Sequence, residues 1–583
     1  MKILLANPYC LDQRVQDYDI RIVPIGLYYI GAVLVENGHD VKIHNWHDAA
    51  GRLEMVADVI ARERPGIVGI SIMHASRWGG IDIARVVRKV APECRVVFGG
   101  PGATFLWEHL LRHFPEIDCI VMGEGELTFL DIARAAFSEN SAEGFRKALC
   151  GIPGIAFRKD GKPFMNEERE FVSDLDTLPD PARYFTFEHL VSSRGCPWNC
   201  TFCGSPMFWK RRVRFHSADY FVSQMERLYN RGVRFFYVSD DTFTVREERV
   251  EEICREIIRR GLDITWYAIS RVNCITENIL YWMRRAGCVQ ISFGVESGSA
   301  TIRKLFNKQI EDAEIIRAFH LSASYGIMPR AYFIYGAPGE SRKTVQKTLK
   351  LVERIKPLSA IFYILDLFPG TAMYDMYVRK KGVKDDIWLR RVEDIMYFEM
   401  DRRLKSRDVL KFGKKLRSGF YKGLSDFATS LSLVDIPELY PFHADFLARL
   451  GMTFLTGDYA AIPDIRDPDR TAEVLLKKAL DYAPCERAFL GLGILMQKRG
   501  DYTGSAEILM QGRKNFSSSP DIDICLGISL ANSGRPEAAL ELFMRHASRQ
   551  DALGHALNCS RVLGDRELEA RLMARIEEVR NAQ

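Results

Sequence analysis

Apolar and polar residues alternate along the first 140 residues in a pattern typical of short buried strands separated by amphipathic helices. Apolar residues recur at helical spacing in stretches such as Leu27–Asn37, Leu53–Glu63, Ile81–Val90 and Phe105–His113. Strands separated by helices of this length predict a parallel sheet covered on both faces, a doubly wound, Rossmann-like α/β fold. The expected strands are Lys2–Ala6, Val41–Asn45, Ile67–Ile72, Arg95–Gly99 and Asp118–Met122.

A second series of strand and helix patterns begins near residue 188. Helical patterns such as Ala218–Tyr229, Arg246–Arg260, Glu277–Ala286 and Arg342–Ile355 follow its strands. Six successive β/α units predict a partial (β/α)6 TIM barrel, in which chemistry takes place at the carboxyl ends of the strands. The expected strands are His189–Ser193, Arg234–Ser239, Ile264–Ile269, Val289–Gly294, Arg330–Tyr335 and Ala360–Leu365.

Helical patterns replace strands after about residue 385. Gly493-Ile494-Leu495 recurs as Gly527-Ile528-Ser529, 34 residues further on, and a Gly-containing turn follows each copy at the same distance. This spacing predicts all-α helical repeats of the tetratricopeptide type. We therefore expect a Rossmann-like domain at 1–145, a Pro- and Gly-rich linker with room for one hairpin at 146–187, the barrel at 188–385, a helical connector at 386–468 and a tetratricopeptide-like repeat region at 469–583.

Composition is that of a soluble globular protein. The chain has 583 residues, 47% of them apolar, and a formal net charge of +5, which is small for this length. Neither the charge nor any Lys/Arg-rich block predicts nucleic-acid binding. The apolar run at the amino terminus is far too short for a signal peptide, and no apolar stretch approaches the length of a membrane span. We expect a cytoplasmic protein.

Thirteen cysteines are present, and most stand singly among apolar residues, as small buried hydrophobes do. A disulfide framework is not expected in a large intracellular chain. Cys196, Cys200 and Cys203 are the exception, because they lie on one loop directly after a predicted strand. Three such thiolates can hold three irons of a [4Fe–4S] cluster and leave the fourth iron open to a ligand. The alternative is a structural zinc ion, for which His216 is the nearest additional ligand.

The cysteine loop resembles the CxxxCxΦC signature of the radical S-adenosylmethionine (SAM) superfamily, in which Phe202 stands at the aromatic position beside the adenine. Three later strand ends also resemble motifs of this family, although each acidic residue alone could be a solvated loop residue. The resemblance implies contacts to the methionyl amine, the ribose hydroxyls and the adenine of SAM. In the same order, the residues concerned are Asp240 and Asp241, Glu296 and Ser297, and Gly336 and Pro338.

The same resemblance implies the chemistry. The open iron would bind SAM, and the reduced cluster would cleave it to a 5′-deoxyadenosyl radical that abstracts a hydrogen atom from an unreactive carbon. An electron donor such as flavodoxin or ferredoxin would reduce the cluster. The protein would position the cofactor and exclude water.

Combined with the barrel, residues 1–145 resemble the cobalamin-binding domain of B12-dependent radical enzymes. The resemblance lies in Pro24–Gly31, which open the first helix, and in the glycine-containing strand ends that follow. Glycine lets a bulky corrin approach the backbone closely. The implied cobalamin contacts are Asn7, Pro8, Tyr9, Ser71, His74, Gly99, Gly100, Ala103, Thr104, Gly123, Glu124, Gly125 and Glu126.

One departure concerns the cobalt ligand. The DxHxxG motif of the methionine-synthase type is absent, since Asn7-Pro8-Tyr9-Cys10 stands after the first strand. Cobalamin would then bind without that histidine. His74 could approach the cobalt, or it could be a polar loop residue that hydrogen-bonds corrin side chains or water. Tyr9, Arg14 and Arg21 are candidates for the interface between the two domains.

Three functional hypotheses follow. The first is methyl transfer from methylcobalamin to an unactivated carbon of a small-molecule, lipid or peptide substrate, with a second SAM that methylates cob(I)alamin. The second keeps the radical but performs cyclisation, ring contraction or C–C coupling without methyl transfer. The third is a redox-sensing scaffold. The helical repeats could bind a protein partner or simply cap the barrel.

Overall fold

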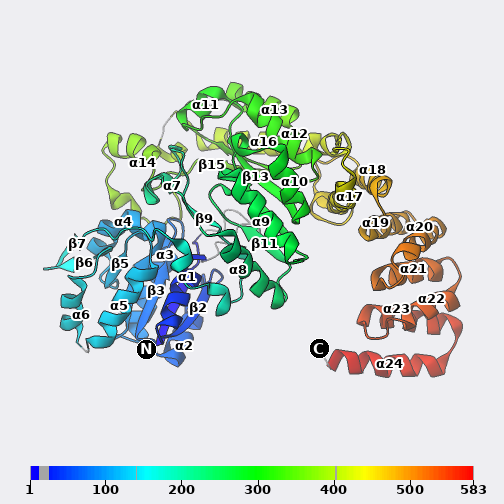
Figure 1. Cartoon of the computed structure of the whole chain (residues 1–583), viewed down its shortest axis with the longest axis horizontal. Helices are drawn as coiled ribbons and strands as arrows, with labels where there is room; N and C mark the ends of the chain where they lie inside the picture. The colour runs from blue at the N-terminus through cyan, green and yellow to red at the C-terminus, as the bar shows by residue number, and fades with distance from the viewer. Residues whose placement is uncertain (1, 12–24, 140, 401–402, 582–583) are drawn as a thin grey trace. The chain divides into compact units, whose positions relative to one another are not determined.

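The computed structural model describes residues 2–11, 25–139, 141–400 and 403–581 (Figure 1). Arg14 and Arg21 lie outside these residues. The chain forms two compact units. The first consists of Met1–Ile315, Ala331–Lys350 and Ile361–Lys414, and the second of Ile316–Arg330, Leu351–Ala360 and Lys415–Gln583.

The first sheet has seven strands in the order β2-β1-β3-β4-β5-β6-β7. Strands β2 to β5 pair in parallel, as the strand pattern predicts, and β6 and β7 are antiparallel. The expected hairpin is therefore present and continues this sheet. The bounds are β1 (Lys2–Pro8), β2 (Asp40–Trp46), β3 (Ile67–Ser71), β4 (Arg95–Gly99), β5 (Cys119–Val121), β6 (Ile155–Lys159) and β7 (Lys162–Met165).

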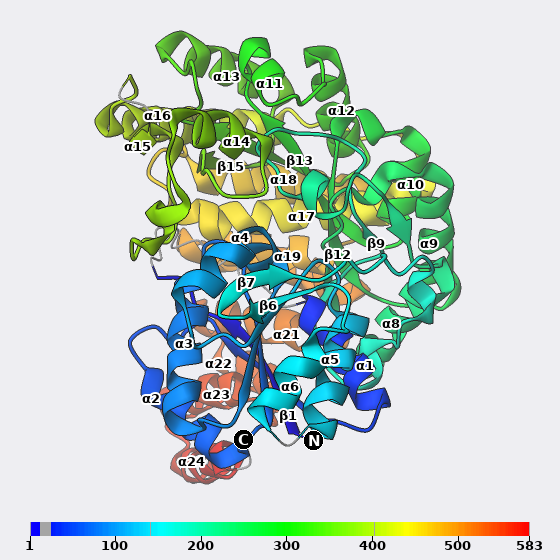
Figure 2. The same ribbon diagram turned by 90° about the vertical axis from the view of Figure 1, so that its left-hand side faces the viewer.

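Helices cover both faces of this sheet (Figure 2). Leu4 and Ala6 of β1 pack in one core with α2, α3 and α4, whereas Ile3 and Leu5 pack in a second core with α1 and α5. Because β1 is buried on both faces, its apolar residues are continuous rather than alternating. The helices are α1 (Ile25–Glu36), α2 (Leu53–Glu63), α3 (Arg77–Val90), α4 (Gly100–His113), α5 (Glu126–Ser138) and α6 (Ala142–Leu149).

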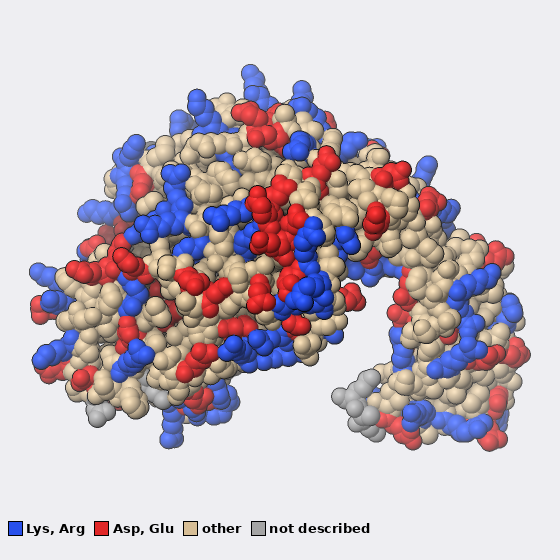
Figure 3. All heavy atoms as spheres, in the orientation of Figure 1, with Lys and Arg blue, Asp and Glu red and all other residues tan. Residues whose placement is uncertain are grey.

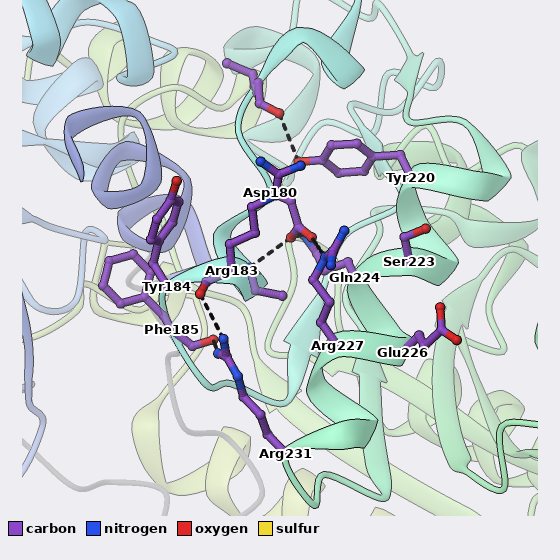
Figure 4. A network of polar contacts seen from close by, with 12 residues as sticks. Asp180, Arg183, Tyr184, Phe185, Tyr220, Ser223, Gln224, Glu226, Arg227 and Arg231 are labelled. Carbon is purple, nitrogen blue, oxygen red and sulfur yellow. Dashed lines mark hydrogen bonds and ion pairs between the residues drawn. The ribbon is translucent and has the colours of Figure 1, made fainter. Parts of the chain in front are cut away.

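The rest of the expected linker is fastened to the barrel helix α8 (Ala218–Asn230) (Figure 4). Asp180 begins the short helix η2 (Pro181–Arg183) and accepts hydrogen bonds from Gln224 Nε2 and Arg227 Nε at 3.0 and 2.9 Å. Arg231 at the end of α8 donates to two carbonyl oxygens of the same linker. These bonds hold the linker in one conformation.

The second sheet has the strand order β15-β14-β13-β12-β11-β8. Its six strands match the expected (β/α)6 partial barrel. The bounds of its strands are β8 (His189–Leu190), β11 (Phe235–Val238), β12 (Thr265–Ser270), β13 (Cys288–Glu296), β14 (Met328–Tyr335) and β15 (Ser359–Ile364), and a separate two-stranded sheet is formed by β9 (Ser193–Arg194) and β10 (Arg214–Phe215). The helices besides α8 are α7 (Ser205–Phe208), α9 (Glu247–Arg259), α10 (Glu277–Arg285), α11 (Ala300–Leu305), α12 (Asp312–Ser324), α13 (Arg342–Ile355) and α14 (Ala372–Tyr377).

The first barrel strand differs from the expectation, because His189–Ser193 is not continuous. The chain leaves the sheet after β8 and forms β9, which pairs antiparallel with β10. The Ser192 N–H donates to Asp240 Oδ1 at 2.6 Å instead of to a neighbouring strand. At this break the chain leaves the six-stranded sheet and leads, through β9, to the cysteine loop.

Residues 385–397, called the strap below, hold no long helix and cross the amino-terminal sheet domain. Arg77 of α3 donates to two strap carbonyl oxygens, and Trp78 Nε1 donates to the carbonyl oxygen of Arg390 at 2.9 Å. Asp82 of α3 pairs with Arg391 of the strap. Trp388, only 1% exposed, packs in the same hydrophobic core as the apolar residues of α3. Its Nε1 donates a hydrogen bond to Tyr374 Oη at 3.1 Å. The strap thus connects the barrel's last β/α unit to the first domain.

The second unit contains the helical repeats. Both copies of the repeated glycine make close contacts between paired helices, since a Cβ on Gly493 would lie 2.8 Å from Leu509, and one on Gly527 would lie 2.6 Å from Phe543. The positive φ of Gly500 and Gly534 ends the first helix of each pair. The helices from the connector onwards are α15 (Tyr397–Met400), α16 (Ser406–Thr429), α17 (Tyr440–Leu455), α18 (Pro468–Tyr482), α19 (Glu486–Lys498), α20 (Tyr502–Asn515), α21 (Pro520–Asn532), α22 (Pro536–Met544), α23 (Gln550–Leu563) and α24 (Arg566–Asn581).

Within the described ranges, none of the helices combines the length and the apolar character that a membrane span requires. Basic and acidic side chains are interspersed over the face shown in Figure 3.

The strap gives the first prediction. Trp388→Ala removes a fully buried ring and leaves a cavity, so it should lower the free energy of unfolding of the first unit by about 3–5 kcal/mol. Urea denaturation followed by circular dichroism measures this loss. The neighbouring Leu389, which is 40% exposed, is the matched control, and Leu389→Ala should cost less than about 0.5 kcal/mol. Equal losses in the two variants would contradict the role given to the strap.

Candidate functional site

The cysteine loop starts at Gly195, directly after β9. Gly195 has φ +97°, and a Cβ there would lie 2.0 Å from the carbonyl oxygen of Arg212, so only glycine fits. Cys196, Cys200 and Cys203 are half-buried free thiols. Burial raises the pKa of the Cys203 thiol to about 12, so a positively charged group is needed to hold it as a thiolate at neutral pH.

His216 does not join the three cysteines. Its ring is stacked on Tyr29 and Tyr220, and its Nδ1 lies 3.0 Å from Asp176 Oδ1. Burial lowers the pKa of His216 to about 4. The nearest candidate for a fourth zinc ligand therefore belongs to the core between α1 and α8. Over the described parts of the chain, no three His, Cys, Asp or Glu side chains are grouped as they would be around a single metal ion.

The two carboxylates after β11 lie in different surroundings. Asp240 is fully buried, and the hydroxyls of Ser192 and Ser193 donate to its Oδ2, so it holds the chain that leads into the cysteine loop. Asp241 accepts a hydrogen bond from Ser205 Oγ at 2.6 Å and lines a cavity. Burial raises the pKa of both carboxyls.

Glu296 ends β13 in a left-handed conformation with φ +66°, which a residue with a side chain rarely adopts. Its Oε1 accepts a hydrogen bond from Lys308 Nζ at 2.8 Å. Ser297 is buried, and its Oγ accepts a hydrogen bond from the Ser299 N–H. The structure therefore holds the Glu296 carboxylate in one orientation at this strand end.

The remaining candidates for SAM contacts lie on neighbouring loops. Gly336 has φ +80° after β14, and Pro338 is half-buried in the same turn. The Phe202 ring packs edge-on against Phe306, with 5.0 Å between the centroids, and so joins the cysteine loop to the end of α11.

A cavity of about 300 Å³ lies at the carboxyl edge of the first sheet. Residues of both domains line it, and on the barrel side they include Ser193, Arg194, Gly195, Ser239 and Asp241. The first sheet contributes eight of the residues expected to contact cobalamin, namely Asn7, Ser71, Gly99, Gly100, Gly123, Glu124, Gly125 and Glu126. Sequence reasoning missed other lining residues because no motif marks them, among them Phe208 and Trp209.

Five other expected residues do not line this cavity. Tyr9 Oη donates to Asp82 Oδ2 at 2.6 Å, and Thr104 Oγ1 accepts a hydrogen bond from the Gly123 N–H. Ala103 is completely buried in the core, and Pro8 ends β1. The His74 ring packs edge-on against Trp388 of the strap, with 4.2 Å between the centroids, and burial lowers its pKa well below the ordinary value.

A buried ion network crosses the cavity wall between the two domains. Arg194, 8% exposed, pairs with Glu124 at 2.8 Å and with Glu126 at 2.6 Å, and Arg214 pairs with Glu124 at 2.9 Å. The Arg194 guanidinium also lies over the ring of Tyr29 at 5.0 Å. Burial alone would raise the pKa of Glu124, but the hydrogen bonds and charges of the two arginines outweigh it and lower the pKa. Arg194 stands two residues before Cys196, so this network joins the cysteine loop to the first sheet.

Comparison with known proteins agrees with this geometry. The family model of the radical SAM superfamily matches residues 190–352, and that of the B12 binding domain matches residues 17–133. An uncharacterised methyltransferase of Pyrococcus horikoshii, PH0819, is 30% identical over 72% of this chain and 92% of its own length. An anaerobic magnesium-protoporphyrin IX monomethyl ester cyclase of Cereibacter sphaeroides is 29% identical over 55% of this chain and 54% of its own.

A solved structure shares the fold. The radical SAM methyltransferase TsrM from Kitasatospora setae, with cobalamin and a [4Fe–4S] cluster bound, aligns with a TM-score of 0.57 at 15% identity over 82% of this chain and 99% of its own. The chain belongs to the cobalamin-binding radical SAM family. It is an enzyme whose cofactors are a [4Fe–4S] cluster, SAM and cobalamin.

The residues present fit these groups. Three free thiols on one loop suit a cluster with an open iron, and they are not paired in disulfides. Cobalamin needs close approach to the backbone, and the strand ends that line the cavity contain Gly99, Gly100, Gly123 and Gly125. A Cβ on Gly99 would meet only Val121, at 3.7 Å, so the space on its other sides is open.

The ion network gives the second prediction. Glu124→Gln removes the charge that two buried arginines share, and should lower the free energy of unfolding at pH 7 by about 1.5–3 kcal/mol. Because the folded pKa of Glu124 is lowered, this stabilisation is complete above the ordinary glutamate pKa and is lost as the pH falls through the folded pKa.

Urea denaturation of both proteins from pH 7 to pH 3 tests this, and the difference between them should shrink below about pH 4.3. The exposed Glu170 is the control, and Glu170→Gln should change stability by less than about 0.5 kcal/mol. A difference between wild type and Glu124→Gln that stays constant down to pH 3 would contradict the assignment.

Proposed function

We propose that this enzyme transfers a methyl group to an unactivated carbon atom of a small-molecule substrate. One observation carries the proposal. The carboxyl ends of both sheets line the same cavity, and the three cysteines follow directly on its barrel wall at Gly195. Such an arrangement would bring a site for cobalamin next to a site for a cluster and SAM. The name of the relative PH0819 supports methyl transfer.

The cysteine loop would hold the cluster through Cys196, Cys200 and Cys203. The SAM contacts would come from Phe202, Asp241, Glu296, Ser297, Gly336 and Pro338. When bound, the cluster supplies one electron to SAM, and cobalamin supplies a methyl group. Asp240 would be a positioning residue rather than a contact, because serine donors take both of its oxygens.

Cobalamin would be held at the carboxyl edge of the first sheet by Asn7, Ser71, Gly99, Gly100, Gly123 and Gly125. Glu124 and Glu126 also line the cavity, but their carboxylates pair with barrel arginines, so they would join the two domains rather than hold cobalamin. Apolar side chains such as Met73, Phe208 and Trp209 line the cavity and would exclude water. His74 would contact the strap rather than cobalt.

Radical chemistry without methyl transfer is the second candidate, and the name of the cyclase relative favours it. The mass of the product distinguishes the two candidates, because only methylation replaces a hydrogen atom of the substrate by a methyl group. An electron donor such as flavodoxin or ferredoxin, and a protein partner on the helical repeats, are further proposals.

The reaction products test the leading proposal. Anaerobically reconstituted enzyme, supplied with SAM, cobalamin, a strong reductant and substrate candidates from lipid, tetrapyrrole and peptide classes, should form both S-adenosylhomocysteine and 5′-deoxyadenosine. Liquid chromatography with mass spectrometry measures both. Formation of 5′-deoxyadenosine alone, with a product of unchanged carbon count, would replace methylation by the second candidate. Failure to cleave SAM would favour the redox-sensing scaffold.

The cobalamin site gives the third structural prediction. Gly99 has an extended backbone that any residue adopts, so Gly99→Leu should fold but fill the open side of the cavity. We expect at least a tenfold weaker affinity for cobalamin, measured by absorbance after gel filtration, with an unchanged iron content. Gly99→Ala is the matched control and should keep most of the binding. Full cobalamin binding by Gly99→Leu would place the cofactor elsewhere.

A further inference from the structure

Arg271 directly follows β12, and its side chain reaches the cysteine loop. The side chain is 4% exposed, and its Nη1 donates to Cys200 Sγ at 3.6 Å. Its Nη2 donates to the carbonyl oxygen of Lys308, and its Nε donates to Asn273 Oδ1 at 3.3 Å. The guanidinium carbon Cζ lies over the ring of Trp198 in the cysteine loop, 4.3 Å from the ring centroid. All three nitrogens therefore donate a hydrogen bond and the group also contacts an aromatic ring, which holds it in one orientation.

The charge of Arg271 lacks the usual partner. Buried charged groups are normally paired with an opposite charge. Across the described residues, no carboxylate lies within ion-pair distance of this guanidinium, and the nearby Glu296 pairs with Lys308 instead. The acceptor in reach that can carry a negative charge is the sulfur of Cys200. The site therefore stabilises negative charge at this sulfur.

We propose that Arg271 sets the reduction potential of the iron–sulfur cluster through its hydrogen bond to Cys200. The inference rests on the proposed ligands Cys196, Cys200 and Cys203. Reduction adds one electron, taken from an external donor, and so adds one negative charge to the cluster and its thiolates. A buried positive donor at one thiolate stabilises the reduced form more than the oxidised form and raises the potential. Arg271 is thus a positioning and tuning residue rather than a ligand.

The fork shape of arginine is part of this role. Nη1 donates to the cysteine loop, and Nη2 donates to the loop that carries Lys308. The guanidinium therefore also sets the distance between the cysteine loop and the Lys308–Glu296 pair. A lysine keeps the charge but is a single point that cannot reach both acceptors with the same geometry.

A redox titration with dithionite, followed by electron paramagnetic resonance, tests the proposal in full-length reconstituted protein without substrate. Arg271→Gln should lower the midpoint potential, so that the ratio of reduced to oxidised cluster at the wild-type midpoint falls at least tenfold, about 59 mV for one electron. Arg271→Lys should shift it in the same direction by less. The matched control is Arg284, a buried arginine of α10 that donates to the Cys288 carbonyl oxygen, and Arg284→Gln should titrate like the wild type.

The ligand set is checked separately by iron content. Cys200→Ala should lose the cluster, and Cys274→Ala, which removes a half-buried thiol outside the loop, should keep it. A cluster retained in Cys200→Ala would overturn the ligand set whatever the potentials are. Unchanged potentials in both Arg271 variants, an equal shift in Arg284→Gln, or loss of iron from both Arg271 variants with unchanged circular dichroism would overturn the tuning role.

Discussion

The ion pairs of Arg194 with Glu124 and Glu126 hold together the carboxyl edges of two sheets that come from separate β/α series. Charges buried this deeply are stable only when each has a partner in good geometry, so the two domains are confined to a narrow range of positions. Arg194 also leads directly into the cysteine loop. The distance between the two proposed cofactor sites therefore depends on the same contact that joins the domains.

The strap reinforces this arrangement from the other side of the first domain. Its carbonyl oxygens accept hydrogen bonds from Arg77 and Trp78, and Trp388 packs against His74. The strap has little secondary structure of its own, so side chains of α3 provide hydrogen-bond donors for its backbone carbonyl oxygens. The barrel is tied to the first domain at both ends of its β/α series, at β9 and after β15. Both connections therefore determine the shape of the cavity that residues of the two domains line.

Much of the fold and the cysteine loop could be predicted from local patterns. Strand runs, helical periodicity and the spacing of Cys196, Cys200 and Cys203 are local, and so are the glycines that line the cavity. Arg271 could not be found this way, because an arginine after a strand has no local mark that distinguishes it from a surface residue. Glu124 and Glu126 were expected to face cobalamin, and only the position of the barrel shows that Arg194 and Arg214 pair with them.

By itself the sequence determined the class of the protein: two β/α series, helical repeats, and a loop of three thiols suited to a cluster with an open iron. These follow from residue spacing along a few turns or strands, which short-range sterics and hydrophobic periodicity dictate. The tertiary structure alone decided which polar groups meet: the arginine at Cys200, the ion network at the cavity wall and the strap on α3. Those contacts join residues far apart in the chain, and their partners depend on how whole domains pack.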